Sequence, residues 1–395
     1  MKYLITASSL RAATTAADSP SPTGRGVDTI AESLTRSNVI LEAFGNAKTV
    51  RNDNSSRFGK YIKLMYDAEK FLIGAYTEKF LLEKTRLMQA DKGERTYHVF
   101  YQIIKGLPES TKSQLHLTDA KEFSMLSNGD TWEVPNVDDK EEFEALHAAL
   151  NTVDIVDGEY DDLMNTLAAL LHLANMDFTE PDGEGARTVP NSPSIPLETL
   201  SSLLGVEAEL LTSAVTVRNV RSGRGSLISM NLTPLQAKEG VAAMVKFMYG
   251  EIFSWLVKKI NRSNATESSS VPACFIGILD IFGFEIMQYN SLSQLCINFA
   301  NEKLQQQFNH QVRRASETRI ALFKADRLTS SFPLCSRPRS LANGEFASTT
   351  TPSIYTRMWT TGSPPPFPFV RSASCRAFFS LVHTCLWRVY CRSSF

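Results

Sequence analysis

The most constraining feature of the sequence is an uninterrupted apolar run, Phe275 to Leu279, that ends at Asp280. Such a run, bounded by polar residues, is typical of a strand that is buried on both faces. Ser291 and Gln294 follow in the Ser-x-x-Gln pattern of a helix capping box. The residues behind that box repeat at helical spacing to about Asn309. A buried strand followed by a helix predicts a mixed α/β fold.

The rest of the body predicts a helix-rich fold with a few strands. Hydrophobic residues make up 43% of the chain, which is enough for a large core. No stretch approaches 18 uninterrupted apolar residues, so the sequence does not predict a transmembrane segment. By periodicity we predict strands over 57–66 and 71–82, helices over 141–150, 160–173, 200–215 and 234–260, and a hairpin over 217–232.

The charge distribution divides the chain. The 395 residues carry 41 bases and 42 acids, a formal net charge of −1 that argues against a nucleic-acid partner. Residues 313–395, in contrast, hold twelve bases and only three acids and are rich in Arg, Ser and Pro. This tail is interpreted either as out-of-frame or intron-derived sequence or as a genuine disordered extension.

The first residues form a third region. Residues 1–17 contain Lys2 and Arg11 and no acid, which matches a transit peptide loosely and a helix end followed by a loop better. We therefore expect three parts: a residual helix end and loop over 1–29, a globular body over 30–312, and the tail.

Two polar segments carry the candidate chemistry: Asn52 to Lys60, which runs into a strand, and Asp280 to Glu285. Each alone is also explained as an ordinary turn. Together they suit a nucleotide phosphate. A Ser hydroxyl is a hard oxygen ligand for Mg²⁺, and an Asp at the end of a strand holds that metal through water. A Gly lets a backbone N–H approach phosphate closely, and Arg57 and Glu285 suit a charge-assisted pair.

These segments resemble switch I and switch II of myosin motor domains. Kinesins share the Asn-x-x-Ser-Ser-Arg and Asp-x-x-Gly-x-Glu skeletons, but the continuation Phe58-Gly59-Lys60 and the spelling Ile281-Phe282-Gly283-Phe284 favour myosin. Asn52 and Asp280 are 228 residues apart, which resembles the long insert that forms the upper jaw of the actin-binding cleft, here about 68–270. Further similar stretches are 41–49, 81–86, 93–101 and 290–306, and the resemblance covers roughly 1–4 and 30–311.

The resemblance implies a partial P-loop NTPase motor core with a mainly helical upper-cleft subdomain, and ATP with Mg²⁺ as cofactors. Residue roles carry over position by position. Asn52 and Asn54 would lie at the nucleotide, Ser55 at the γ-phosphate and lytic water, and Ser56 on Mg²⁺. Asp280 would hold the metal through water, the Gly283 amide would face the γ-phosphate, and Arg57 with Glu285 would close the site.

The same resemblance implies an actin filament as partner, through hairpin 217–232, and a cytoplasmic location on the cytoskeleton. Ser226, in that hairpin, follows Arg221 and Arg224 and corresponds to a position that is phosphorylatable or acidic in some myosins. We therefore treat it as a candidate phosphorylation site, with an ordinary turn serine as the alternative.

Two departures qualify the function. No Gly-x-x-x-x-Gly-Lys-[Ser/Thr] run occurs in the sequence, and Met1 to Leu4 resembles the end of the helix that follows that loop. The likeness also stops after Gln311-Val312, so light chains are not expected. Two hypotheses follow: a fragment of an actin-activated ATPase motor that is inactive as this chain, or a non-catalytic actin-side binding module.

Overall fold

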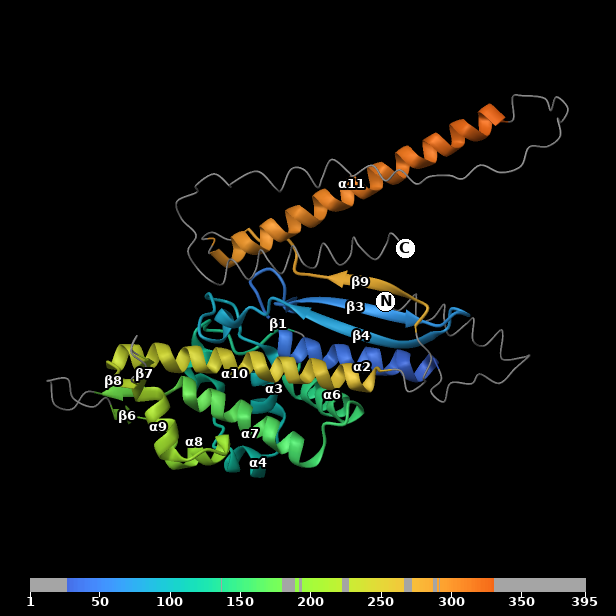
Figure 1. Cartoon of the computed structure of the whole chain (residues 1–395). Coiled ribbons are helices and arrows are strands. Elements are labelled where there is room, and N and C mark those ends of the chain that lie inside the picture. The colour runs from blue at the N-terminus through green and yellow to red at the C-terminus, as the bar shows by residue number, and fades with distance from the viewer. Residues whose placement is uncertain are drawn as a thin grey trace, which may run out of the picture. The chain divides into compact units, whose positions relative to one another are not determined.

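The computed structural model describes residues 27–135, 137–179, 189–191, 194–221, 227–265, 272–286, 290 and 292–329 (Figure 1). The chain divides into two compact units, residues 1–282 and 283–395, and each is described by itself. Among the described elements, the sheets and helices α2 to α10 belong to the first unit. A helix-rich α/β fold with small antiparallel sheets results, as the sequence predicts.

The largest sheet of the first unit has three strands in the order β4-β3-β9, all antiparallel: β3 (Gly59–Tyr66), β4 (Leu72–Phe80) and β9 (Cys274–Asp280). All three were predicted from the sequence. Helices α2 (Val27–Gly45) and α10 (Pro234–Ser263) pack against β4 and cover one face (Figure 1). The buried side chains between them form a small core: Leu34, Ile62, Leu64, Tyr66, Leu72 and Ala75.

Strand β9 corrects the expectation of a buried strand over 275–279, because it is largely exposed. Phe275 is 40% exposed and Leu279 is 48% exposed. The reason is its place in the sheet, because β9 is an edge strand and β3 is its only partner among the described residues. Apolar composition predicted the strand correctly but not its position.

Helices make up more of the described first unit than strands do, and one large apolar core joins them. The predicted helix over 200–215 is in fact two, because Gly205 ends the first in the left-handed conformation, with φ 65°. Besides α2 and α10, the helices are α3 (His98–Gly106), α4 (Glu109–Gln114), α5 (Ser124–Ser127), α6 (Asp139–Thr152), α7 (Asp157–Ala174), α8 (Leu197–Leu204) and α9 (Ala208–Thr216), with short 3₁₀ turns at Lys84–Leu87 and Ala120–Glu122.

Helix α10 is long and apolar enough to span a membrane by length and composition alone. It is instead a core helix, since Tyr249, Phe253 and Leu256 are fully buried in the large apolar core. Thr233 and Gln236 form a capping box at its start. Its length and hydropathy are therefore explained by burial within the protein.

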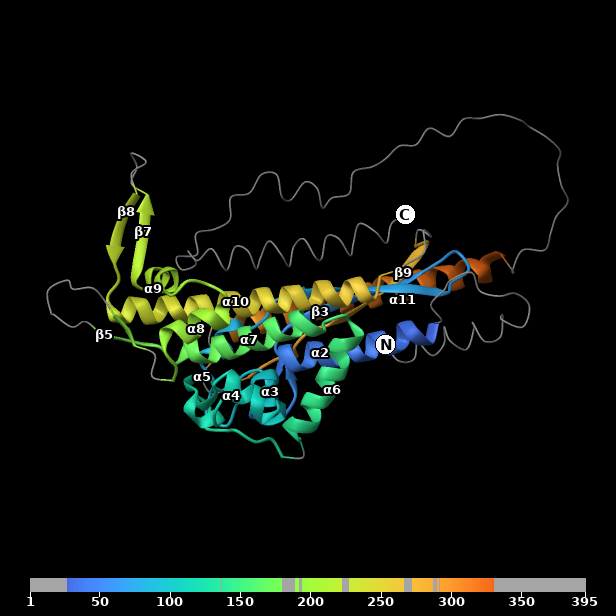
Figure 2. The same ribbon diagram turned by 90° about the horizontal axis from the view of Figure 1, so that it is seen from below.

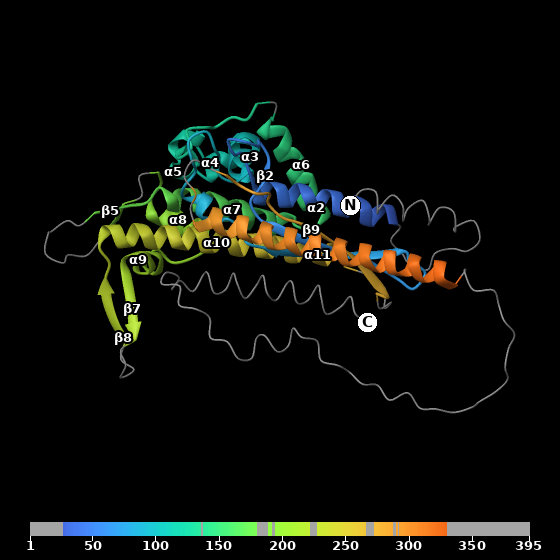
Figure 3. The ribbon, with the colours of Figure 1, turned by 90° about the horizontal axis from the view of Figure 1, so that it is seen from above.

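Three two-stranded ladders complete the first unit. They pair β1 (Asn46–Ala47) with β2 (Ser55–Ser56), β5 (Asp177–Thr179) with β6 (Val189–Asn191), and β7 (Val217–Arg221) with β8 (Leu227–Asn231). The last is the predicted hairpin, which projects from the helices (Figures 2 and 3). Ser226 lies outside the described residues.

The second unit contains α11 (Leu292–Thr329). The helix ends twenty residues beyond the predicted end at about Asn309, so the first part of the expected tail is helical. Arg313 and Glu317 form an i,i+4 ion pair at 3.1 Å there, which favours continuation of the helix. Residues 330–395 lie outside the described part of the chain.

Candidate functional site

Strand pairing brings the two polar segments of the sequence together. Lys60, at the start of β3, pairs in register with Asp280, at the end of β9, and its Nζ lies 3.3 Å from the Asp280 carboxylate. A Cβ on Gly59 would lie 3.1 Å from a methyl group of Ile281, so the two chains pass closely here. Segments more than 200 residues apart therefore share one end of the sheet.

The first polar segment is a turn held by its own side chains. Strand β1 pairs with β2 through Asn46 and Ser56. Between them, the Thr49 N–H and hydroxyl donate to the Asn52 carbonyl at 2.8 and 3.1 Å, and the Asn52 side chain accepts from the Asn54 N–H at 3.0 Å. Asn52 and Asn54 are exposed. The turn therefore lies at the surface and is held in place by hydrogen bonds of its own side chains.

Ser55 and Ser56 lie half-buried at the end of this turn. The Ser56 hydroxyl donates to the Phe58 carbonyl at 2.9 Å, and the Ser55 hydroxyl accepts from Arg57 at 3.2 Å. A hydroxyl that donates still has lone pairs to offer. The side chain of Asp280 is 55% exposed. Hydroxyl and carboxylate oxygens are the kind of ligand that Mg²⁺ prefers, so the chemistry of Ser56 and Asp280 suits that ion, and the metal site itself stays a prediction.

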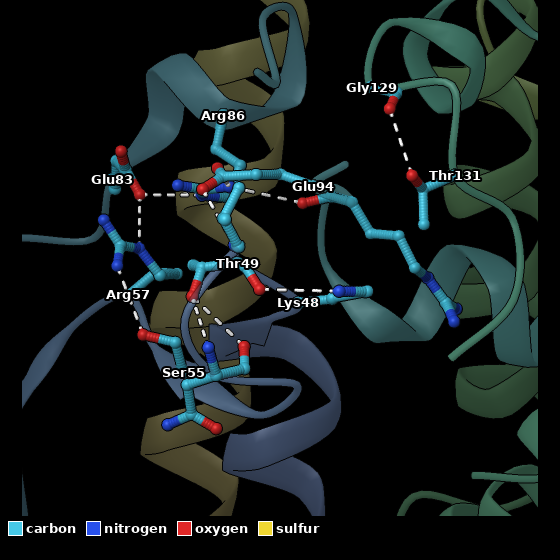
Figure 4. Close-up of polar contacts among 12 residues, drawn as sticks. Lys48, Thr49, Ser55, Arg57, Glu83, Arg86, Glu94, Gly129 and Thr131 are labelled. Atoms are coloured by element: carbon cyan, nitrogen blue, oxygen red, sulfur yellow. Dashed lines mark hydrogen bonds and ion pairs between the residues drawn. The ribbon is translucent and has the colours of Figure 1, made fainter. Parts of the chain in front are cut away.

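Arg57 is fully buried and pairs with a residue that the sequence analysis did not assign. Its Nε lies 2.6 Å from a carboxylate oxygen of Glu83, which follows strand β4 (Figure 4). The expected partner, Glu285, belongs to the second unit, where its backbone exchanges hydrogen bonds with the Asn298 side chain at 2.8 and 2.6 Å. Gly283 belongs to that unit too. The bridge between Arg57 and Glu285 stays a prediction.

Further charged residues of the site were missed by sequence reasoning. Arg86 contacts both Glu83 and Glu94, at 2.8 and 2.7 Å, and these three residues lie within the stretches 81–86 and 93–101 that carried the family resemblance. Arg95 Nη2 donates to both carboxylate oxygens of Asp139 at 2.9 and 3.1 Å. The alternation of acids and arginines over 83–95 was the available signal for an ion-pair network.

The side chain of His98 contacts the turn. Its Nε2 lies 3.2 Å from the Asn54 side-chain oxygen, and burial together with the charge of Arg95 lowers the pKa of His98 to about 3. The imidazole is therefore neutral at physiological pH, and Nε2–H donates to that oxygen. Asn46 Nδ2 donates to the same oxygen at 2.9 Å. The turn is thus fixed by neutral hydrogen bonds on this side.

Comparison with known proteins identifies the fold that carries this site. Residues 1–318 match the family Myosin head (motor domain). The chain belongs to the myosin head family. The match includes residues 5–29 and 312–318, which lie outside the stretches that carry the resemblance, and it covers most of the chain.

Curated relatives agree with this assignment. The chain is 40% identical to "Myosin-2" of Saccharomyces uvarum over 277 residues and 40% identical to "Myosin heavy chain, non-muscle" of Drosophila melanogaster over 279 residues. It is 39% identical to "Unconventional myosin-Ic" of mouse over 295 residues. These matches cover 70%, 71% and 73% of the chain but only 17%, 13% and 27% of the relatives. Different kinds of myosin match equally well, so the class of this myosin head is not fixed by identity.

Proposed function

We propose that this chain is the part of an actin-based, ATP-driven motor that contains switch I and switch II. The observation that carries the proposal is the pairing of Lys60 with Asp280. It brings the end of the Ser55–Ser56 segment and the Asp280 carboxylate to one end of the sheet, as a phosphate and its metal require. Membership of the myosin head family supports the same function and a place on the cytoskeleton.

In this proposal the residues of unit 1 hold one side of a Mg²⁺–ATP site. Ser56 offers a hydroxyl oxygen to Mg²⁺ and Asp280 offers a carboxylate through water, while Asn52, Asn54 and Ser55 face the phosphates. Magnesium, when bound, neutralises charge on the phosphate oxygens. The protein's own contribution is to orient the nucleotide and a water molecule. We further propose that Arg57 and Glu285 pair when the site closes, with the Gly283 amide facing the γ-phosphate.

The 395 residues by themselves, we propose, do not hydrolyse ATP. The sequence contains no Gly-x-x-x-x-Gly-Lys-[Ser/Thr] run, which supplies several backbone N–H donors, a lysine and a hydroxyl in such sites. One donor at a developing charge is worth about 3 kcal/mol, so a missing cradle should abolish turnover. The assay is magnesium-dependent phosphate release by the purified chain. Hydrolysis above background that is lost in Ser56→Ala would contradict the proposal.

Actin binding tests the motor assignment without depending on turnover. We expect the purified chain to sediment with actin filaments through the hairpin of β7 and β8. Arg218 is exposed on β7, and Arg218→Glu should weaken sedimentation by about threefold to tenfold, because charge complementarity steers such interfaces. Arg262→Glu, exposed near the end of α10, is the matched control. A chain that does not sediment with actin would contradict the motor assignment and leave the family membership unchanged.

Phosphorylation of Ser226 is the remaining part of the proposal. A phosphate would add about two negative charges to a basic hairpin that faces the partner. Ser226→Glu and Ser226→Ala should therefore differ in actin affinity, measured by the same sedimentation assay. Equal affinities would mean that Ser226 is an ordinary turn serine.

A further inference from the structure

A buried chain of alternating charges lies next to the switch I turn. Arg57 contacts Glu83 at 2.6 Å, Glu83 contacts Arg86 at 2.8 Å, and Arg86 contacts Glu94 at 2.7 Å (Figure 4). The four side chains are between 0 and 13% exposed. We call these four residues the ion-pair chain. Its members are buried in pairs, which is the condition under which charged side chains are retained in an interior.

Both ends of the ion-pair chain reach the turn. At one end, Arg57 Nη1 donates to the Ser55 hydroxyl at 3.2 Å. At the other end, a carboxylate oxygen of Glu94 accepts from the Val50 N–H at 3.3 Å. Between these two attachment points, residues 51–54 are exposed. The ion-pair chain therefore holds the flanks of the turn and leaves its middle open to a ligand.

Backbone hydrogen bonds attach the turn to the same segment of the chain. The Glu83 N–H donates to the Arg57 carbonyl at 2.9 Å, and the Arg95 N–H donates to the Lys48 carbonyl at 3.0 Å. The Tyr97 hydroxyl donates to the Glu83 carbonyl at 2.8 Å and fixes that residue from the helical side. The turn is thus attached to residues 83–97 at both flanks, and its position follows that of Glu83.

Glu83 is the central residue because one of its carboxylate oxygens serves two arginines. Burial alone raises the pKa of the Glu83 carboxyl, but the charges of Arg86 and Arg57 act in the opposite direction and hold that pKa below its usual value. The carboxylate is therefore ionised at neutral pH. Without its charge, two buried guanidinium groups would lie close together with no anion between them, and they would repel each other.

We propose that Glu83 is a positioning residue for switch I: acting through Arg57 and Arg86, its charge fixes where the Ser55 hydroxyl and the turn 50–55 lie. The importance of that position for catalysis rests on the proposed nucleotide-binding function. The positioning itself does not, and it is measurable in the protein without nucleotide. A role in packing alone is the competing explanation, and charge separates the two.

The test is hydrogen exchange of the full chain in Glu83→Gln, which keeps the shape and removes the charge. We expect backbone amides of residues 49–58 to exchange about tenfold faster, because their attachment is lost, while helices α3 and α7 change less than about twofold. Glu83→Asp keeps the charge, so the exchange rates of residues 49–58 in this variant should stay within about threefold of the wild-type rates. The matched control is Glu78→Gln, which breaks the half-exposed pair with Lys63 at 2.5 Å and should leave 49–58 unchanged.

Two results would overturn the proposal. Equal acceleration in 49–58, α3 and α7 would mean that Glu83 only stabilises the fold, and so would equal effects of Gln and Asp. No acceleration in 49–58 would mean that Glu83 does not hold the turn. If Glu83→Gln does not fold, Arg57→Lys serves instead, since it keeps the charge next to Glu83 but removes the donor to Ser55. Its expected acceleration is confined to residues 53–58, and its absence would also refute the proposal. A failure to bind actin bears on the proposed function and not on this result.

Discussion

The helices between His98 and Ser263 and the three-stranded sheet are stabilised in different ways. The helices share one large core in which Leu167, Tyr249 and Phe253 are fully buried. Among the described residues, the core between the sheet and α2 contains six buried side chains, and the outer strand β9 is largely exposed. The candidate chemistry lies at the end of the less protected region. This agrees with the general observation that sites which bind and move are drawn from the less stable parts of a structure.

The segment 83–97 lies between these two regions and couples them. It follows strand β4 and leads into α3, and it contains three members of the ion-pair chain. Phe58, next to Arg57, also reaches the helical core through an edge-to-face contact with Phe253, with ring centroids 4.9 Å apart. The turn 50–55 is therefore attached to the helical region as well as to the sheet.

The largest effect is expected in the helical core. Phe253→Ala should lower the free energy of unfolding by about 4 kcal/mol, because it removes a buried ring and leaves a cavity next to Phe58. Phe247→Ala on the same helix is the matched control, since Phe247 is 62% exposed and should cost less than about 1 kcal/mol. Urea unfolding of both variants gives the comparison. Similar costs at the two positions would contradict the assigned burial of α10.

The next effect concerns a buried charge. Asp139→Ala leaves Arg95, which is fully buried, without its carboxylate and should cost about 3 kcal/mol. The ring of Tyr101, whose centroid is 3.6 Å from the guanidinium carbon, still contacts Arg95 and keeps the loss at this level. Asp177→Ala breaks the exposed pair with Lys238 and should cost less than about 1 kcal/mol. Equal losses in urea unfolding would argue that water reaches Arg95.

Lowering the pH should destabilise the folded chain through His98. The pKa of His98 is lowered to about 3 in the folded chain from 6.5, so between these values the unfolded chain binds a proton that the folded chain does not. Stability therefore falls as the pH falls below 6.5, by about 2 kcal/mol between pH 7 and pH 5. Burial lowers the pKa of His172 as well, which acts in the same direction. His98→Gln should remove the part of this stability loss that comes from His98. Unfolding at pH 7 and at pH 5 measures it. If the variant loses as much stability as the wild type between these pH values, the assigned burial of His98 is wrong.

Much of this fold was predictable from local pattern. The pattern of 57–66 and the apolar run 275–279 predicted both strands of the Lys60–Asp280 pairing, and helical spacing predicted α6, α7 and α10. The position of a strand within the sheet was not predictable from local pattern. The run 275–279 reads as doubly buried, but strand order makes it an edge. Gly205 ends α8 in the left-handed conformation, which glycine adopts without strain. Hydrophobic spacing alone does not reveal this break between two helices.

The roles of Ser55, Ser56 and Asp280 stay predictions from motif. Strand register places Lys60, which follows the serines in the chain, opposite Asp280. The Arg57 contact with Glu83 was not predicted, since 26 residues separate them and only tertiary packing decides which acid lies next to a buried guanidinium. A motif names residues, whereas the structure shows the partners that hold them.

The smallest change in stability, and the sharpest test of the contrast, is expected on β9. Ile276 pairs with Leu64 across the sheet, yet Ile276 is 42% exposed whereas Leu64 is fully buried. Ile276→Thr keeps a β-branched side chain and should cost less than about 1 kcal/mol, while Leu64→Thr, on the same face, should cost about 3 kcal/mol. An exposed apolar edge strand is a template for pairing with another chain, so Ile276→Thr should also reduce self-association. Urea unfolding and sedimentation velocity measure the two effects. If Ile276→Thr costs as much as Leu64→Thr, or leaves self-association unchanged, β9 is covered in solution and the contrast between the two regions does not extend to this edge.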